Sequence, residues 1–151
     1  RQAKPNIISL FKCSEKEKPK NVIDNAKVLS QTLLEDCFDV VSGGTDNHLM
    51  VVDLRTFDSE LTGAVAQDVL DRSGITLNKN TVPDDPRSPF VTSGMRIGTP
   101  STTTQGMKES EMVQIADFIA RTLRNREDEQ EIAAVRAEVA ELCNQFPVYG
   151  S

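Results

Sequence analysis

Three long segments repeat their apolar residues at the three-to-four-residue spacing of an amphipathic helix. This spacing predicts helices from about Asn21 to Asp36, from Lys108 to Arg124 and from Glu131 to Phe146. A shorter helix is predicted between Thr62, a good N-cap, and Gly74, which suits the position after a helix C-terminus. The inward-facing residues of the three long helices are Val22, Ala26, Leu29 and Leu33; Met112, Ile115, Ile119 and Leu123; and Ile132, Val135, Val139, Leu142 and Phe146.

Short apolar runs between these helices predict strands. The predicted strands are Phe38–Val41, His48–Arg55, Ile75–Leu77 and Met95–Thr99. The first two flank a glycine-containing loop, which favours an antiparallel pair. The segment Ile7–Phe11 is interpreted as either a short strand or an apolar anchor, and Asn78–Pro89, with its three prolines, as a loop.

The order of these elements predicts an α+β fold of two layers. Helices would cover one face of a small, mostly antiparallel sheet of three or four strands. The length of 151 residues suits one domain, which we place at residues 21–151. Residues 1–20 are not assigned to it.

Composition narrows the functional classes. The chain has 23 acidic and 17 basic residues, and this net charge of −6 argues against general nucleic-acid binding. No apolar run approaches the ~20 residues of a membrane span. Three widely spaced cysteines and one histidine favour neither a zinc site nor a disulfide framework, and free thiols are typical of the reducing cytoplasm.

Motifs for nucleotide binding or for a serine nucleophile are missing. The sequence has no Gly-x-Gly-x-x-Gly, Walker or Gly-x-Ser-x-Gly pattern. The neighbouring carboxylates of Asp84 and Asp85 are interpreted as surface acids, because nothing in the sequence indicates a raised pKa.

Arg96 is the most informative candidate for a binding residue. It lies between Met95 and Ile97 on a predicted strand, so alternation directs it away from their face, and Gly94 and Gly98 leave room beside it. Most strand arginines are solvated or paired with a local acid. The alternative is that this guanidinium binds a small planar anion such as a carboxylate.

Several segments together resemble serine hydroxymethyltransferase. They are Ser42–Arg55, Gly74–Pro83, Ser88–Pro100 and Phe146–Tyr149, and the similarity covers about residues 21–151. The family is a pyridoxal-phosphate enzyme of fold type I that interconverts serine and glycine, with tetrahydrofolate as the one-carbon carrier. The resemblance implies that this chain is the small C-terminal domain alone.

The resemblance also implies roles for three residues. Arg96 falls at the family's substrate-carboxylate arginine, Asn80 at the asparagine that contacts the pterin of folate, and Phe90 near the folate aminobenzoate. Without the family, Asn80 is interpreted equally well as a loop cap and Phe90 as a core anchor. No role is assigned to His48, for which a turn or an interface is the favoured interpretation.

Other family features are missing from this chain. The lysine that forms a Schiff base with the cofactor belongs to a Thr-Thr-His-Lys stretch, whereas Thr102–Gln105 contains neither histidine nor lysine. No catalytic residue is therefore expected here, and the chain alone should be inactive. Gln105 stands where the family often has arginine, and Cys37 where glycine commonly ends the first helix.

Three functions remain open at this level. The leading hypothesis is a domain that completes its site with the missing large domain, in a cytoplasmic homodimer or tetramer. The second is a non-catalytic binding or scaffold module derived from that domain. The third is another enzyme of the same fold type, which the folate-side residue Asn80 disfavours.

Overall fold

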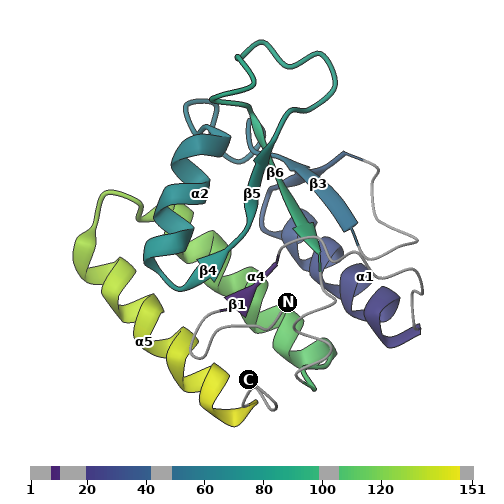
Figure 1. Ribbon diagram of the computed structural model, residues 1–151, viewed down its shortest axis with the longest axis vertical. Helices are drawn as coiled ribbons and strands as arrows, with labels where there is room; N and C mark the ends of the chain where they lie inside the picture. The colour runs from purple at the N-terminus through teal and green to yellow at the C-terminus, as the bar shows by residue number, and fades with distance from the viewer. Residues whose placement is uncertain (1–7, 11–19, 42–48, 99–105, 147–151) are drawn as a thin grey trace.

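Helices cover one face of a four-stranded antiparallel sheet in the computed structural model, which describes residues 8–10, 20–41, 49–98 and 106–146 (Figure 1). The strand order is β2-β3-β6-β5, and a parallel pair, β1-β4, forms a second small sheet. The strands are β1 (Ile8–Ser9), β2 (Asp39–Val40), β3 (Leu49–Asp53), β4 (Ile75–Thr76), β5 (Asn78–Asn80) and β6 (Gly94–Gly98). The predicted α+β fold with a small antiparallel sheet is confirmed.

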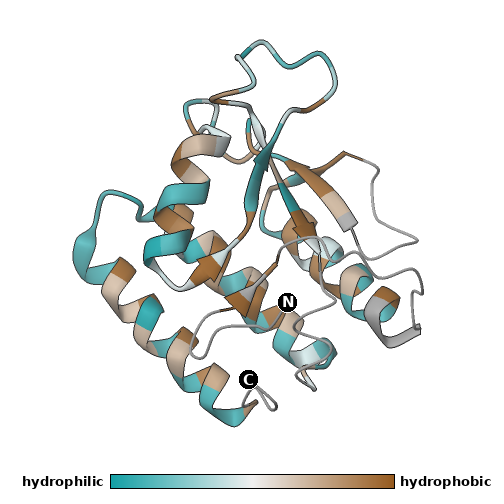
Figure 2. Cartoon of the chain, in the orientation of Figure 1, coloured by the Kyte–Doolittle hydropathy of each residue, from teal (hydrophilic) through white to brown (hydrophobic). Residues whose placement is uncertain are grey.

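The helices form the layer that covers the sheet. They are α1 (Lys20–Glu35), α2 (Gly63–Arg72), α4 (Glu109–Arg124) and α5 (Glu129–Gln145). Helices α1 and α2 contact the strands, α4 packs against both of them, and α5 packs on α4. The apolar faces of the helices turn toward the interior (Figure 2). The predicted inward residues that are buried are Ala26, Leu29, Leu33, Met112, Ile115, Ile119, Leu123, Ile132, Val135, Val139 and Leu142.

One segment near the sheet contradicts the prediction from the sequence, and another decides between two alternatives that the sequence left open. The interpretation of Asn78–Pro89 as a loop is wrong at its start, because Asn78–Asn80 form β5 and pair with β6. Asn and Lys have low strand propensity, so the neighbouring strand and not local preference makes this segment extended. Near the N-terminus, the strand alternative is confirmed: Ile8–Ser9 form β1, and Ile8 and Leu10 are fully buried.

Helix α1 ends in a Schellman motif that is centred on Cys37. The Phe38 amide donates to the Leu33 carbonyl at 3.0 Å, and the Cys37 amide donates to the Leu34 carbonyl at 3.2 Å. Leu33 and Phe38, which flank the motif, are both buried. The motif requires a left-handed residue at Cys37, whose φ is 74°. A side chain with a Cβ is strained in this conformation, whereas glycine is not.

Replacing Cys37 with glycine is therefore expected to stabilise the fold. Removing the left-handed strain gains more than the extra freedom of glycine costs in the unfolded chain, so we expect the free energy of unfolding to rise by about 0.5–1 kcal/mol. Urea denaturation under reducing conditions measures it. The matched control is Cys37→Ala, which removes the thiol but keeps the Cβ. Equal stabilisation by both variants would show that the thiol, and not the backbone, is responsible.

Candidate functional site

The two faces of the four-stranded sheet differ in chemistry. Strand register places one set of side chains toward the helices. In this set Lys79 is half-buried, and the apolar members are all buried: Val40, Met50, Val52, Met95 and Ile97. Apart from Val51, the residues placed on the opposite face whose side chains the structure describes are polar residues or glycines: Asp39, Asp53, Asn78, Asn80, Gly94, Arg96 and Gly98. The sheet therefore has an apolar face that forms the core and an opposite, more polar face that carries Arg96 and Asn80.

Arg96 lies at the centre of this polar face. It is the middle residue of β6, and its partners across the sheet are Val51 on β3 and Asn78 on β5. Gly94 and Gly98 precede and follow it on the same face, so no side chain of β6 stands beside the guanidinium. Two paired strands hold the backbone, and the side chain is half-buried. This arrangement presents the guanidinium from a rigid element.

No described acid neutralises Arg96. The nearby acid on this face, Asp53, is bound by Arg55, whose Nη2 lies 2.7 Å from Oδ2 and whose Nε lies 3.0 Å from Oδ1. This side-chain hydrogen bonding lowers the pKa of Asp53 in spite of the opposing effect of burial. Arg96 makes no hydrogen bond or ion pair within the described ranges, and its buried Nε has no partner. The alternative in which Arg96 pairs with an acid of the described residues is therefore excluded.

Asn80 ends β5 on the same face as Arg96. Its register partner is Gly94, two residues from Arg96 on the neighbouring strand. Its side-chain amide donates to the Thr81 carbonyl at 2.8 Å, which is a local loop contact. Asn80 is half-buried, and its amide oxygen has no protein donor among the described residues. The structure places Asn80 and Arg96 together on one face.

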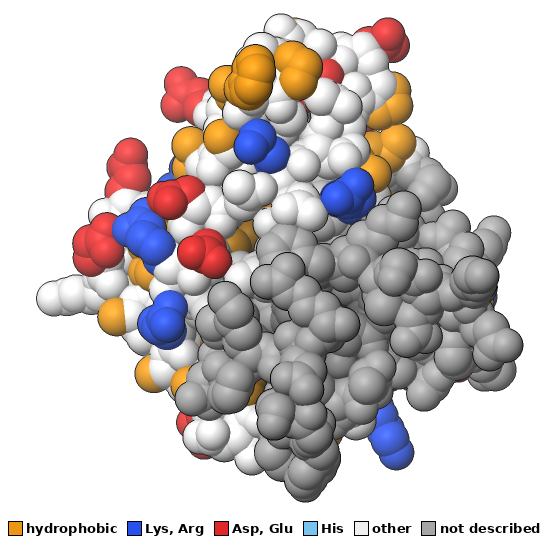
Figure 3. Space-filling view, in the orientation of Figure 1, with side chains coloured by type: hydrophobic (Ala, Val, Ile, Leu, Met, Phe, Trp, Pro, Cys, Tyr) orange, Lys and Arg blue, Asp and Glu red, His pale blue; other side chains and the backbone are white. Residues whose placement is uncertain are grey.

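Phe90 lies in the loop that joins β5 to β6, which extends beyond the sheet at the top of Figure 1. Its side chain is 84% exposed, and Val91 beside it is 37% exposed. Hydrophobic side chains gather over this end of the molecule in the space-filling view (Figure 3). The interpretation of Phe90 as a core anchor is therefore wrong, because an exposed aromatic ring contributes no core packing.

The same loop contains a hydrogen-bonded carboxylate that the sequence interpretation missed. Asp85 is not a simple surface acid: it accepts hydrogen bonds from the amides of Val82, Arg87 and Ser93 and from the Ser93 hydroxyl. Desolvation raises the pKa of Asp85, but these four donors outweigh it and lower the pKa to about 2. The contact to the amide two residues later is an Asx turn, and the Asp-Pro pair was the sequence signal for such a turn.

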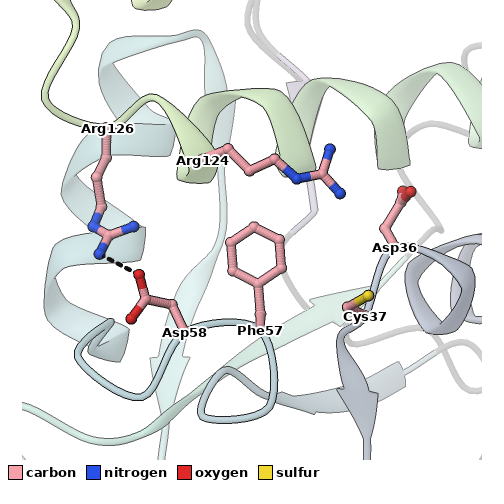
Figure 4. Close-up of a pocket in the computed structure, with 6 residues that line it drawn as sticks. All are labelled: Asp36, Cys37, Phe57, Asp58, Arg124 and Arg126. Atoms are coloured by element: carbon pink, nitrogen blue, oxygen red, sulfur yellow. Dashed lines mark hydrogen bonds and ion pairs between the residues drawn. The ribbon is translucent and has the colours of Figure 1, made fainter.

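A hollow of about 280 Å³ lies elsewhere, at the ends of α1 and α4 (Figure 4). Arg126 pairs with Asp58 at 2.7 Å, and Arg124 lies over the Phe57 ring at 5.6 Å. The Phe57 ring also stacks on the ring of Phe38, and the two ring centroids are 4.2 Å apart. None of Arg96, Asn80 and Phe90 lines this hollow. Asp58, Arg124 and Arg126 are engaged in these contacts, and we do not assign the candidate site to this hollow.

The site is incomplete in the described residues. No lysine stands on the Arg96 face of the described strands, since Lys79 is the partner of the core residue Met95 and faces the helices. His48 and Gln105 lie outside the described residues.

Within the described ranges, no cluster of three His, Cys, Asp or Glu side chains could hold a metal ion. Every helix in these ranges is too short or too polar to span a lipid bilayer.

Comparison with known proteins identifies the family. The sequence model of the family described as serine hydroxymethyltransferase matches residues 8–119. The chain is 50% identical over 135 residues to a serine hydroxymethyltransferase of Halorhodospira halophila and 52% identical over 135 residues to one of Polynucleobacter asymbioticus. Each match covers 89% of this chain and 32% of the relative, so the chain spans about a third of the length of these proteins. The chain, with its polar sheet face around Arg96, therefore belongs to the serine hydroxymethyltransferase family.

Proposed function

We propose that this chain is the C-terminal third of a serine hydroxymethyltransferase and supplies the residues that bind the two substrates. The complete enzyme interconverts serine and glycine and uses tetrahydrofolate as the one-carbon carrier. Because the chain spans about a third of its relatives, the remaining residues of the site come from the missing two thirds. Assembly as a homodimer or tetramer belongs to the same proposal.

Arg96 is proposed to bind the carboxylate of serine or glycine. The observation that carries this assignment is the half-buried guanidinium without an acid partner among the described residues. A buried cationic donor without a partner is unfavourable, and a substrate carboxylate removes this cost by accepting two parallel hydrogen bonds. Two such bonds also fix the rotation of the amino acid, so that its reacting bond is held in one orientation.

Asn80 and Phe90 are proposed to bind tetrahydrofolate. The amide of Asn80 offers both a donor and an acceptor, which suits the mixed polar edge of a pterin. Phe90 offers an exposed aromatic surface against which the folate aminobenzoate ring can pack. Asn80 lies on the Arg96 face, and the Phe90 loop begins directly after Asn80, so the two substrates would lie side by side.

Pyridoxal phosphate does not fit the described residues alone, because their polar face offers an anion-binding arginine but no lysine. We assign the cofactor and its lysine to the part of the enzyme outside this chain. When bound there, the cofactor stabilises negative charge at the substrate α-carbon. This chain contributes substrate binding and orientation, and by itself it is proposed to be inactive.

A chimera tests the proposed function. This chain replaces the matching segment of the Polynucleobacter asymbioticus relative, to which it is 52% identical. We expect the purified chimera to transfer the one-carbon unit of serine to tetrahydrofolate, which yields glycine, methylenetetrahydrofolate and water, because the two parts together restore the complete site. The isolated chain, assayed in parallel with added pyridoxal phosphate, should show no conversion. A folded chimera that retains the cofactor but has no activity would instead support a non-catalytic binding module.

A further inference from the structure

The loop between β5 and β6 is closed by one carboxylate. Asp85 Oδ2 accepts hydrogen bonds from the Val82 amide at 3.3 Å and from the Ser93 amide at 2.8 Å. Val82 lies two residues after Asn80, and Ser93 lies three residues before Arg96. A single oxygen therefore joins the outgoing and returning ends of the loop.

The second oxygen of Asp85 holds the interior of the loop. Oδ1 accepts from the Arg87 amide at 2.9 Å and from the Ser93 hydroxyl at 2.8 Å. All four hydrogen bonds to the Asp85 carboxylate therefore come from groups of its own loop. Hydrogen bonds to an ionised acceptor are about twice as strong as neutral ones, so the four together favour this closed conformation of the loop.

Arg87 attaches this closed loop to the segment before α2. Its guanidinium donates to the Ser59 carbonyl at 2.8 Å, to the Leu61 carbonyl at 3.2 Å and to the Ser93 hydroxyl at 2.9 Å. Ser93 is fully buried and is shared by Asp85 and Arg87. The loop is thus held at its base by a network of Asp85, Arg87 and Ser93, which we call the loop clamp.

The clamp lies next to the two ends of the loop, where the backbone is already tightly packed. Gly94 is the register partner of Asn80, and a Cβ added to Gly94 would lie 2.8 Å from the Val52 carbonyl oxygen and 2.9 Å from that of Asn80. The side chain of Val82 is buried against the same glycine. Both ends of the loop therefore lie directly against the pairing of Asn80 with β6.

We propose that Asp85, Arg87 and Ser93 are positioning residues for the folate substrate: their clamp holds Asn80 and the Phe90 loop at a preset distance from Arg96. This inference rests on the proposed function, because it takes Asn80 and Phe90 as the folate side of the site. None of the three residues needs to touch a substrate. A loop that is already ordered binds its ligand without a further loss of conformational entropy, so the clamp acts on folate affinity.

The test compares two neighbouring acids in the chimera. Asp85→Asn replaces an acceptor-only group by one that also donates, which breaks part of the clamp. Asp84→Asn makes the same chemical change at an exposed position and is the matched control. We expect Asp85→Asn to raise the KM for tetrahydrofolate about tenfold or more, which is the effect of losing at least one charge-assisted hydrogen bond. The Kd for glycine should change less than about twofold in both variants.

A raised KM for tetrahydrofolate with an unchanged Kd for glycine separates positioning from general destabilisation. A loss of folded protein lowers the number of active sites but leaves the KM and the Kd of the remaining sites unchanged. The inference is overturned if Asp85→Asn and Asp84→Asn give the same KM for tetrahydrofolate, or if Asp85→Asn weakens glycine binding as strongly as folate binding. If Asp85→Asn does not fold, Ser93→Ala replaces it. That variant loses only the shared hydroxyl, and it should raise the KM for tetrahydrofolate about threefold or more with the glycine Kd unchanged; an unchanged KM for tetrahydrofolate again overturns the inference.

Failure of the inference and failure of the proposed function give different results. An inactive unmodified chimera contradicts the proposed function before any variant is made. An active chimera in which Asn80→Ala leaves the KM for tetrahydrofolate unchanged contradicts the folate assignment, and with it the inference. An active chimera that responds to Asn80→Ala but not to disruption of the clamp contradicts the positioning role alone.

Discussion

Replacing Arg96 with alanine in the active chimera is expected to lower kcat/KM for serine by about 10²- to 10³-fold. The variant removes the donors of a half-buried guanidinium that has no acid partner among the described residues. Loss of one side of a buried, hydrogen-bonded charge pair costs about 3–4 kcal/mol, which corresponds to this range. Steady-state kinetics with varied serine at saturating tetrahydrofolate measure the effect.

Two further variants show whether the loss comes from binding geometry. Arg96→Lys keeps the charge but not the planar fork of donors, so it should recover only part of the activity. Arg136→Ala removes an exposed arginine on α5 that donates to the Arg72 carbonyl, and it should stay within about twofold of the unmodified chimera. If Arg96→Ala retained kcat/KM for serine within about twofold, the guanidinium would not be the substrate ligand.

Replacing Gly63 with alanine is expected to cause the largest loss of stability among the substitutions considered. A Cβ at Gly63 would lie 2.0 Å from the Thr92 Oγ1 and 2.4 Å from the Gly94 carbonyl oxygen. Thr92 cannot easily yield, because it is buried, has a φ of 58° and donates its hydroxyl to the Gly94 carbonyl at 3.1 Å. Relief therefore requires a backbone shift, and we expect a cost of about 3 kcal/mol.

Urea denaturation of the isolated chain, followed by circular dichroism, measures this loss. The matched control is Val65→Ala in the same first turn of α2, where the side chain is 41% exposed and the change should stay within about 0.5 kcal/mol. The Gly63 amide donates to the Thr92 carbonyl at 3.1 Å, so the strain falls on the residues that lead into β6. Unfolding at the same urea concentration for Gly63→Ala and the unmodified chain would show that α2 can move away from this backbone at little cost.

The helices and the central strand could be predicted because local patterns and tertiary packing agree there. Thr62 accepts a hydrogen bond from the Val65 amide at 3.1 Å as the predicted N-cap, and Gly74 has the left-handed φ of 93° that its position after α2 requires. Alternation along β6 correctly placed Met95 and Ile97 in the core and Arg96 on the opposite face. These features depend on residues close together in the sequence.

The remaining features depend on partners that are distant or unusual. The polar segment Asn78–Asn80 is a strand only because β6 pairs with it, which no local propensity indicates. Asp85 resembled a surface acid because its donors include Ser93, eight residues away. Phe90 was open to interpretation as a core residue because its type is usually buried, whereas its clamped loop holds it in solvent. His48 and Gln105 lie outside the described residues, and no role is assigned to them.

The most direct measurement of the central claim is a crystal structure of the active chimera with glycine bound. We predict that both carboxylate oxygens of glycine accept hydrogen bonds from the Arg96 guanidinium at about 2.7–2.9 Å, one of them from the buried Nε. A structure in which the glycine carboxylate lies beyond about 4 Å from this guanidinium, or in which Arg96 is paired with a carboxylate of the protein, would contradict the claim.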